Sequence, residues 1–583
     1  MKKILISIVA IALVLSLASC EFLFSGETGT TAATTNKPDN VPPELPKYIK
    51  SIDGLNEQII VTIDSSYGYE YEIYYKSSLA EDYSKLDTEL MIQGDGVINC
   101  YILGISAGTY TVKVVALNVG NTIIEDITVS AQDRSGYAHF GATEGVGAYN
   151  NDGTVKEGTK IIYVTNETKN TVTMEMNGKT YTGLVNILQA QYNSSTPMLV
   201  RIIGKITTNQ WNYKNVEPRL IDGSNAIDDF FVNTFSTEYG ENLANLRVTI
   251  KGDRSYIYKT TPEGLTDVRY GNNNPGSVDY KGSDYPSLKG MKVYDDDSYY
   301  NMLEVSAVKN LTIEGIGTDA EIFQFGITFE KSNSIEIKNL TFTGYPEDAL
   351  GFRGNDEDGD GGKSEREYLA NYGRYWIHNC TFNRGYNAWD ISGERDKYAG
   401  DGTIDFNNIS NVTLAYNKYD DCKKTMLFGS NDSQACMNMT MHHNYFYRVD
   451  SRLPLGRHSN IHAYNNYYEA SGNCADLRAG SYLFSEANYF KSTSKPFIID
   501  SSYVKSYGDV FEGGGNPNAT IVTDRTKKMN SGTCKPDKVN NLMNFDTNST
   551  LFYYDSTNKC SDVSILLKAE DVPEFVIKHA GAG

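Results

Sequence analysis

Three aspartates in the middle of the chain have the type and spacing of metal ligands. Asp401 and Asp405 are four residues apart, and an even spacing places two side chains on the same face of a strand. Asp348, beside Glu347, comes earlier and would join the pair if successive turns of the chain stack on one another. Carboxylates held close together repel unless a cation lies between them, and Ca²⁺ prefers oxygen ligands of this kind. The pattern predicts a calcium site, with polar turn residues on a solvated face as the alternative.

Three cationic residues follow the aspartates and suit the binding of an acidic ligand. Lys424 comes first, and Arg452 and Arg457 stand five residues apart around Pro454. A guanidinium group binds a carboxylate through two parallel hydrogen bonds, so a pair of arginines can clamp an acidic substrate. Taken alone, the pair is more typical of ordinary surface charge.

The insertion after Asp348 contains a second acidic pattern, which runs from residue 356 to residue 367. It matches the twelve-residue EF-hand loop at its acidic positions, which are Asp356, Asp358, Asp360 and Glu367. Lys363 stands where that loop usually has an apolar residue, and no flanking helix pair is evident. The segment is therefore either a second, structural calcium site or a solvated acidic loop.

The elements that must position these residues carry a repeat. Six short strand-like units end at an asparagine and are followed by an aromatic residue, and the asparagines are Asn339, Asn379, Asn417, Asn444, Asn466 and Asn488. The last two intervals are 22 residues each, and a fixed period near 20 indicates a solenoid of stacked coils. An asparagine that recurs at one turn can form a hydrogen-bonded ladder and adopt left-handed backbone angles. The longer intervals indicate inserted loops, which should carry the chemistry.

The beginning of the chain predicts export. Residues 1–19 contain two lysines and then an apolar stretch, which is typical of a signal peptide, and Leu17-Ala18-Ser19-Cys20 looks like a bacterial lipobox. By that resemblance Cys20 is lipidated and becomes the mature N-terminus, and the alternative is an ordinary signal peptide with a chance cysteine. Residues 20–46 are rich in Thr, Gly, Ala, Asn and Pro and predict a flexible tether.

Residues 47–132 alternate apolar and polar positions in short runs, which predicts a small β-sandwich. The run from Gly108 to Leu117 resembles a late strand of fibronectin type III modules. No cluster of exposed aromatic residues marks this part as a sugar binder, so a spacer is the default interpretation.

The composition restricts partners. The formal net charge of −20 excludes nucleic-acid binding through a global positive field, and an acidic polysaccharide would need local cations. Seven cysteines remain if Cys20 is lipidated, so they cannot all pair within one chain. Cys422 with Cys436, or Cys534 with Cys560, could form disulfides in an exported protein.

Residues 133–583 resemble the pectate lyases of polysaccharide lyase family 1. The resemblance rests on Arg452-Leu453-Pro454-Leu455-Gly456-Arg457 ahead of His462-Ala463-Tyr464-Asn465-Asn466, on the Asp401 and Asp405 pair followed by Lys424, and on Glu570-Asp571-Val572-Pro573 near the end. It implies a right-handed parallel β-helix over residues 133–583, so the whole chain would be an all-β protein with a sandwich ahead of a β-helix.

The same resemblance assigns roles to individual residues. Asp348, Asp401 and Asp405, assisted by Glu347, would hold Ca²⁺, and Arg452 would be the catalytic base. Lys424 and Arg457 would bind substrate carboxylates, with His462 as a further substrate-binding candidate. His442, His443 and His462 are equally residues of the type that fills a ladder or core.

The implied function is calcium-dependent cleavage of α-1,4-polygalacturonate by β-elimination, which leaves a 4,5-unsaturated product. Arginine is ordinarily protonated, and positive neighbours would favour loss of its proton, so we expect an alkaline optimum. Three alternatives remain open, namely a pectin lyase on methylated substrate, a polygalacturonase-type hydrolase, and a silent surface protein that only binds glycans. We further expect a monomer that is exposed at the cell envelope and held to the membrane through Cys20.

Overall fold

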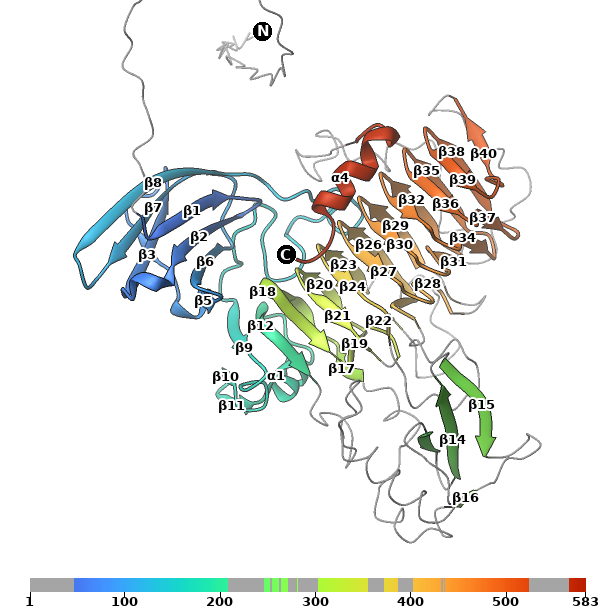
Figure 1. Ribbon diagram of the computed structural model, residues 1–583, viewed down its shortest axis with the longest axis horizontal. Helices are drawn as coiled ribbons and strands as arrows, with labels where there is room; N and C mark the ends of the chain where they lie inside the picture. The colour runs from blue at the N-terminus through green and yellow to red at the C-terminus, as the bar shows by residue number, and fades with distance from the viewer. Residues whose placement is uncertain are drawn as a thin grey trace, which may run out of the picture. The chain divides into compact units, whose positions relative to one another are not determined.

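The computed structural model describes residues 47–207, 302–323, 325–345, 347–354, 372–385, 402–430, 434, 436–523 and 566–583, and the backbone of four strands between residues 246 and 281 (Figure 1). The segments predicted as signal peptide and tether, residues 1–19 and 20–46, lie outside the described residues. No helix in the described part of the chain has the length and apolar character needed to cross a membrane.

The first described part consists of two four-stranded antiparallel sheets. One has the order β1 (Ile49–Gly54), β2 (Gln58–Asp64), β6 (Val97–Leu103), β5 (Met91–Gly94), and the other β4 (Ser84–Lys85), β3 (Tyr71–Ser77), β7 (Gly108–Ala116), β8 (Asn121–Val129). Every second residue of β2 and β7 is buried, as the alternating sequence predicts. The specific likeness to a fibronectin type III module stays a prediction.

The larger part is a solenoid of parallel strands, which confirms the predicted all-β, right-handed parallel β-helix. Sheet 1 contains β17 (Met302–Ser306), β19 (Gly326–Glu330), β22 (Leu350–Arg353), β25 (Ile404–Asn407), β28 (Met426–Phe428), β31 (Leu455–Arg457), β34 (Asn473–Arg478) and β37 (Lys495–Ile499). Each strand pairs in parallel with the strand one coil earlier, so residues far apart in sequence become neighbours.

Two further stacks close the coil. Sheet 2 contains β9 (Lys160–Val164), β12 (Met198–Thr207), β18 (Lys309–Phe323), β20 (Asn333–Lys338), β23 (Gly373–His378), β26 (Ile409–Ala415), β29 (Cys436–His442), β32 (Asn460–Tyr464), β35 (Tyr482–Glu486), β38 (Tyr503–Tyr507) and β40 (Thr520–Val522). Sheet 3 begins on the second half of β18 and continues through β21 (Thr341–Thr343), β24 (Thr381–Phe382), β27 (Lys418–Asp420), β30 (Tyr445–Tyr447), β33 (Tyr467–Glu469), β36 (Tyr489–Thr493) and β39 (Val510–Gly514).

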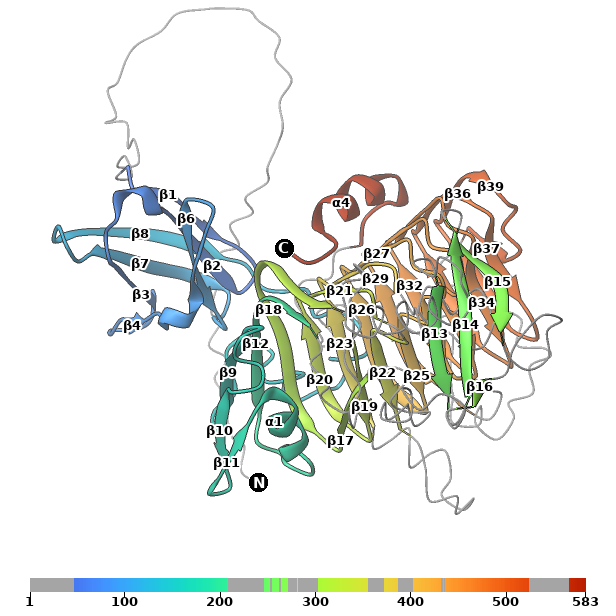
Figure 2. The same cartoon turned by 60° about the horizontal axis from the view of Figure 1, so that its bottom comes forward.

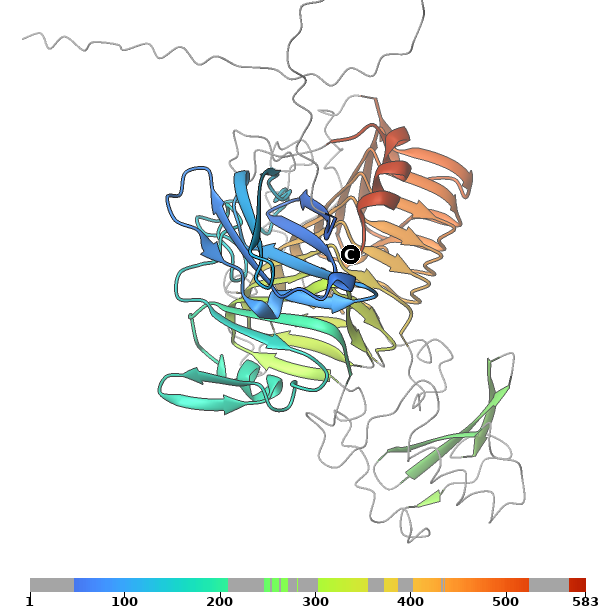
Figure 3. The same ribbon diagram turned by 60° about the vertical axis from the view of Figure 1, so that its left-hand side comes forward.

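Smaller elements flank the solenoid. A hairpin of β10 (Thr173–Met176) and β11 (Lys179–Thr182) leads into helix α1 (Leu184–Ala190), and β13 (Leu246–Lys251), β14 (Arg254–Thr261), β15 (Gly264–Tyr270) and β16 (Tyr280–Lys281) form a separate antiparallel sheet. A C-terminal helix, α4 (Val572–His579), follows a 3₁₀ turn at Ala569–Asp571. Figure 3 shows α4 beside the sheet 3 strands, and Val572 and Val576 pack there against Tyr467.

The core of the solenoid is built from columns of like residues. One aromatic ring per coil stacks on the next with centroids 4.5 to 5.1 Å apart, in the order Phe342, Phe382, Tyr419, Phe446, Tyr468, Phe490 and Phe511. All of these rings except Phe511 belong to aromatic residues of the sequence repeat. Their contacts combine a large buried apolar area with the geometry that aromatic pairs prefer.

The predicted asparagine ladder is present but shorter than the sequence pattern. Asn417, Asn444 and Asn466 each donate from Nδ2 to the Oδ1 of the next asparagine, over 3.2, 2.8 and 2.9 Å, and the column ends where Asn488 donates to Asp509 over 3.1 Å. Each Oδ1 also accepts the backbone N–H of the preceding residue in the column. The ladder therefore satisfies polar groups that would otherwise be buried without partners.

Asn339 and Asn379 stand outside this hydrogen-bonded column. The register aligns them with Tyr416, His443 and Asn465, one residue before the ladder position, where φ lies between 49° and 54° in all five residues. Asparagine tolerates that left-handed conformation. The asparagines of the sequence repeat therefore occupy two adjacent positions of the coil, the left-handed turn position and the ladder position, which have different roles.

The outer face of sheet 2 is covered by the segment 133–150, which precedes the solenoid. Backbone N–H groups of Tyr137, Ala138 and Ala148 donate to the hydroxyls of Thr440, Thr413 and Thr312 over 2.8 to 3.1 Å. The covered face is therefore a packed interior.

A buried polar cluster lies under this cover. His442 Nε2 donates to the Ser135 carbonyl over 3.2 Å, so its Nδ1 accepts from His443 Nδ1 at 2.9 Å. Asp133 accepts from Ser135 and from the hydroxyl of Tyr416. Burial lowers the pKa of His442 to about 4 and that of His443 well below its usual value, so both rings are neutral.

The buried cysteines are thiols. Cys422 and Cys436 donate separately to the carbonyls of Phe382 and Phe406, over 3.3 and 3.1 Å, and burial raises their pKa to about 11 and about 12. The suggested disulfide between Cys422 and Cys436 is therefore wrong for this structure, because the two thiols donate to carbonyls on different coils. Cys534 and Cys560 lie outside the described residues.

We predict that acid destabilises the solenoid through His442. A histidine whose folded pKa is about 4 must stay neutral in the native state, whereas the unfolded chain takes up a proton below about pH 6.5. Neutral His442 therefore contributes roughly 3 kcal/mol to the free energy of unfolding. This contribution is complete above about pH 6.5 and is lost as the pH falls towards 4. Urea unfolding of the wild type and His442→Gln at a series of pH values should show a stability difference that shrinks on acidification. A difference that is constant with pH would contradict the assignment.

Candidate functional site

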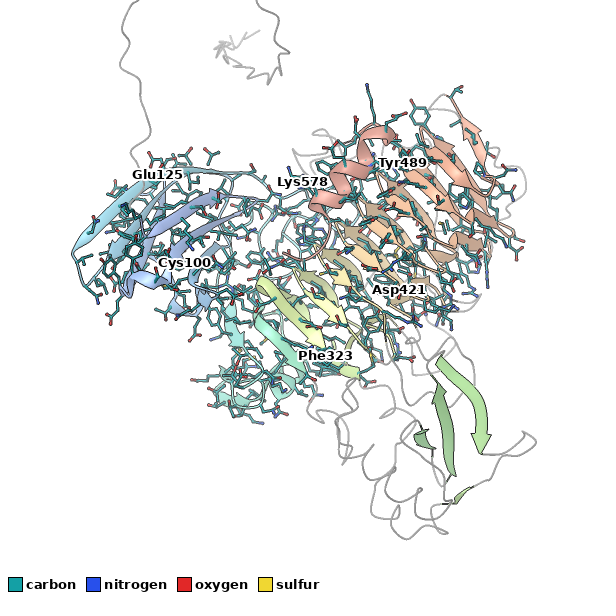
Figure 4. All side chains as sticks on the ribbon, in the orientation of Figure 1. Cys100, Glu125, Phe323, Asp421, Tyr489 and Lys578 are labelled. Atoms are coloured by element: carbon teal, nitrogen blue, oxygen red, sulfur yellow. The ribbon has the colours of Figure 1, made fainter. Side chains whose placement is uncertain are left out.

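The predicted site residues that the structure describes come mainly from one row of the solenoid. The register aligns Leu350 with Ile404 and Met426, so Asp348, Gly402 and Lys424, two residues earlier, occupy equivalent positions on three consecutive coils. Asp348 is thus one coil before Asp405, closer than the spacing in sequence indicates. Asp421, labelled in Figure 4, lies in the turn that leads to Lys424.

Asp348 and Asp405 converge on Gly402. A Cβ atom at Gly402 would lie 2.5 Å from Asp348 Oδ1 and 3.0 Å from Asp405 Oδ1, so both oxygens approach the space that the missing side chain leaves. Asp348 is nearly buried, at 4% exposure, whereas Asp405 and Glu347 are half-buried. Two carboxylates so close together raise each other's free energy unless positive charge is near.

The cationic residues occupy the next two coils. Lys424 pairs with Ser451 across an isolated parallel bridge, and Arg452 follows Ser451 directly. The Arg452 backbone is left-handed, with φ of 65°, and is held from both sides. Its N–H donates to Asn473 O over 3.1 Å, and its carbonyl accepts from Met426 N over 2.9 Å. Lys424 and Arg452 are half-buried and therefore partly accessible to a ligand.

Arg457 lies at the end of β31 on the coil of Arg452. Its Nη1 donates to the carbonyl of Gly429 over 2.8 Å, which anchors the guanidinium to the preceding coil. The residue aligned with it on the next coil is Arg478, which Asp476 holds through two hydrogen bonds of 3.0 and 2.7 Å. Sequence reasoning missed Arg478 and Gly402, although the i, i+2 spacing of Asp476 and Arg478 on a strand is a usable signal.

Some predicted residues lie outside the described part of the chain. They are the calcium candidate Asp401, the acidic-loop residues Asp356, Asp358, Asp360 and Glu367, and the lipidation candidate Cys20.

His462 is not brought to this face. It belongs to β32 in sheet 2, where the register aligns it with Thr440, and it is 1% exposed. Its Nε2 pairs with Glu486 over 3.0 Å, and its ring stacks on Phe484 at 5.0 Å. These contacts match the core interpretation, and we leave His462 out of the substrate contacts.

Asp348 and Asp405 fit Ca²⁺ better than the buried cluster of Asp133 with two histidines does. Asp133, His442 and His443 have potential ligand atoms within 4.8 Å of one another, but two of the three offer imidazole nitrogen, and hydrogen bonds already occupy both nitrogens of His442 and Nδ1 of His443. Ca²⁺ takes oxygen ligands at about 2.3–2.6 Å. The carboxylate oxygens around Gly402 are of that kind, and the absence of a side chain at Gly402 lets both oxygens approach this position.

The arrangement can act on an acidic ligand. Carboxylates on the coils of β22 and β25 suit a cation, and Lys424, Arg452 and Arg457 on the next coils suit anions. Such a face can hold a carboxylate and stabilise negative charge that develops beside it.

Comparison with known proteins agrees with this geometry. A family model described as pectate lyase matches residues 282–581, more than half of the chain and including all the cationic site residues. The chain is 30% identical over 355 residues to a pectate lyase of Bacillus subtilis (strain 168), covering 53% of this chain and 77% of the relative.

Two further comparisons have lower coverage or lower identity. Pectate lyase 3 of Pectobacterium carotovorum is 33% identical over 195 residues, which cover 32% of this chain and 47% of that protein. A solved pectate lyase from Bacillus sp. N165, in complex with trigalacturonate, aligns over 77% of this chain and 98% of its own with 18% identity and a TM-score of 0.41. The resemblance drawn from the sequence is confirmed by the family match and the Bacillus relative: the chain belongs to the pectate lyase family, and the protein is a polysaccharide lyase.

Proposed function

We propose that the protein is a calcium-dependent pectate lyase that cleaves α-1,4-polygalacturonate by β-elimination and releases 4,5-unsaturated oligogalacturonides. The observation that carries the proposal is the convergence of Asp348 and Asp405 on Gly402, one coil from Lys424 and two from Arg452. A hydrolase, which needs paired carboxylic acids that activate water, would leave Lys424 and Arg452 unexplained, and a pectin lyase would have no use for a cation site.

The reaction begins with removal of a proton from C5 of a galacturonate residue. That carbon is next to a carboxylate, so the carbanion adds negative charge beside an existing anion. Calcium bound by Asp348, Asp401 and Asp405 would supply positive charge that stabilises the substrate carboxylate as this charge develops. Lys424 and Arg457 bind substrate carboxylates and add to the same stabilisation.

Arg452 is the proposed base. In its neutral form it takes the C5 proton, and the electron pair of the broken C5–H bond forms the C4–C5 double bond. The bond from C4 to the glycosidic oxygen then breaks, and the oxygen leaves with its electron pair and takes up a proton. Water is not a nucleophile in this sequence, so the product is unsaturated.

The decisive assay measures ultraviolet absorbance while the protein acts on polygalacturonate, with calcium and with a chelator. We expect a calcium-dependent rise from the unsaturated product and a loss of about 10³-fold in rate for Arg452→Ala, as for removal of a general base. Arg452→Lys is the matched control, because it keeps the charge but changes the geometry of the base, and it should also be slow. New reducing ends without absorbance would mean hydrolysis. Retention by pectin without either signal would mean a binding protein.

Gly402→Ala provides a separate test of the cation site. The added Cβ would overlap Asp348 Oδ1 and crowd Asp405 Oδ1. We expect the calcium concentration for half-maximal activity to rise by roughly 10-fold or more, in the range seen when groups around a metal are disturbed. Gly94→Ala is the control, because a Cβ there meets no atom within 4 Å. An unchanged calcium requirement in Gly402→Ala would remove the cation from this position.

We also propose that the protein is an exported monomer, exposed at the cell envelope and anchored by lipid on Cys20. The support is the lysine-led apolar segment that ends at Leu17-Ala18-Ser19-Cys20. Mass spectrometry of the mature protein should find an N-terminal peptide that begins at Cys20 and carries acyl chains. A mature N-terminus elsewhere, without lipid, would leave an ordinary secreted enzyme.

A further inference from the structure

A shallow hollow of about 620 Å³ lies beside strand β11 and helix α1, at the N-terminal end of the solenoid. Hydrogen-bonding, cationic and aromatic side chains line it together, and these are Lys179, Thr180, Tyr181, Thr182, Asn186, Gln189 and Tyr192. No residue of the site around Gly402 belongs to it.

The lining has the chemistry of a sugar-binding surface. Tyr192 is 61% exposed, an unusual amount for a large aromatic side chain, and such a ring can stack on the face of a pyranose. Asn186 donates from Nδ2 to the Thr182 carbonyl over 2.8 Å, which orients an amide whose oxygen can accept from a hydroxyl. Gln189, one helical turn away, is exposed as well.

A cation gives the hollow a preference for acidic sugars. Lys179 Nζ lies 4.8 Å from the centre of the Tyr181 ring, so its charge is held at the aromatic surface. Glu175, on the paired strand, aligns with the lining residue Thr180, and alternation places Lys179 and Tyr181 on the other face of the hairpin. Because the chain carries a formal charge of −20, a local cation matters for any polyanion.

Helix α1, which lines the hollow, lies beside the first strand of the sheet that carries the proposed active site. The inner side of α1 buries Leu184, Ile187 and Leu188 in the solenoid core. Directly after the helix, Asn193 N donates over 2.9 Å to Ala307 O, at the end of β17. Strand β17 is the first strand of sheet 1, and Figure 2 shows α1 beside it. Asp405 lies on β25, three strands further along the same sheet.

We propose that this hollow is an accessory binding shelf for a galacturonan segment remote from the bond being cleaved. The proposal rests on the proposed function, because the occupant is the polymer that the lyase would cut. Tyr192 stacks on a sugar ring, Asn186 and Gln189 bond its hydroxyls, and Lys179 binds its carboxylate. Such a shelf raises affinity for a long chain without touching the chemical step, since a short oligomer cannot occupy both sites.

The test compares long and short substrates in the full-length protein. For the double variant Lys179→Ala/Tyr192→Ala we expect KM for polygalacturonate to rise roughly fivefold, because an aromatic and a charged contact are both lost. Its kcat/KM on trigalacturonate should stay within about twofold of wild type. The matched control is Lys76→Ala/Tyr67→Ala, which removes a lysine 5.0 Å from the Tyr83 ring and a tyrosine that is 38% exposed, both in the sandwich. It should leave both substrates unaffected.

A second measurement separates the shelf from the lyase activity. In native gels with embedded polygalacturonate, the Arg452→Ala protein should be retarded, and adding the double substitution should reduce the retardation. An unchanged KM and unchanged retardation would overturn the shelf, as would equal losses on polymer and trimer, which indicate a folding defect. If the wild type forms no unsaturated product, the proposed function fails, and the gel still decides whether the hollow binds polyuronate.

Discussion

The parallel register between successive coils is the constraint on which the rest of the solenoid depends. Side chains alternate along each strand, so a slip of one residue in any coil would exchange its core residues for its outer ones. Two columns oppose such a slip. The rings from Phe342 to Phe511 stack only when equivalent positions align, and the amides from Asn417 to Asn488 bond only at one register. Residues as distant in sequence as Asp348 and Lys424 are therefore placed by regular strands.

The charged residues on the outer faces of sheets 1 and 2 are arranged in different ways. On sheet 2 the cover segment excludes water and charges neutralise one another, as where Arg201 and Lys338 contact Glu314 over 2.8 and 3.2 Å. Burial alone would raise the pKa of Glu336, but Lys338 and His378 hold it at about 2. On sheet 1, in contrast, Asp348 and Asp405 share one space and the cations stand on the following coils. Paired charges serve stability, whereas two carboxylates that share one space favour a bound cation, which is why the proposed cation site belongs to sheet 1.

The sequence was informative where one residue type recurs for one reason. Aromatic and asparagine positions repeat because each coil must continue the same column, and that repetition predicted the solenoid. It could not separate Asn379 from Asn417, because asparagine suits both a left-handed turn and a ladder. The importance of Gly402 was also hidden, since a glycine carries no chemistry and matters only through the oxygens around it. The role of His462 could not be decided from the sequence, because a histidine can belong either to the family motif or to the core. Only the register of β32 assigns it to the covered sheet.

The left-handed turn positions show how stacking also controls the site. At the turn before the ladder, Asn379, Tyr416, His443 and Ala487 all have positive φ, so side-chain identity matters little when neighbouring coils bond the backbone. Arg452 is in the same situation, with positive φ and backbone bonds to Asn473 on one side and Met426 on the other. A non-glycine residue in this region costs about 1–2 kcal/mol, and it persists where the surroundings determine it. The same inter-coil bonds that build the solenoid thus hold the backbone of the proposed base, so the position of the chemistry follows from the way each coil is laid on the one before.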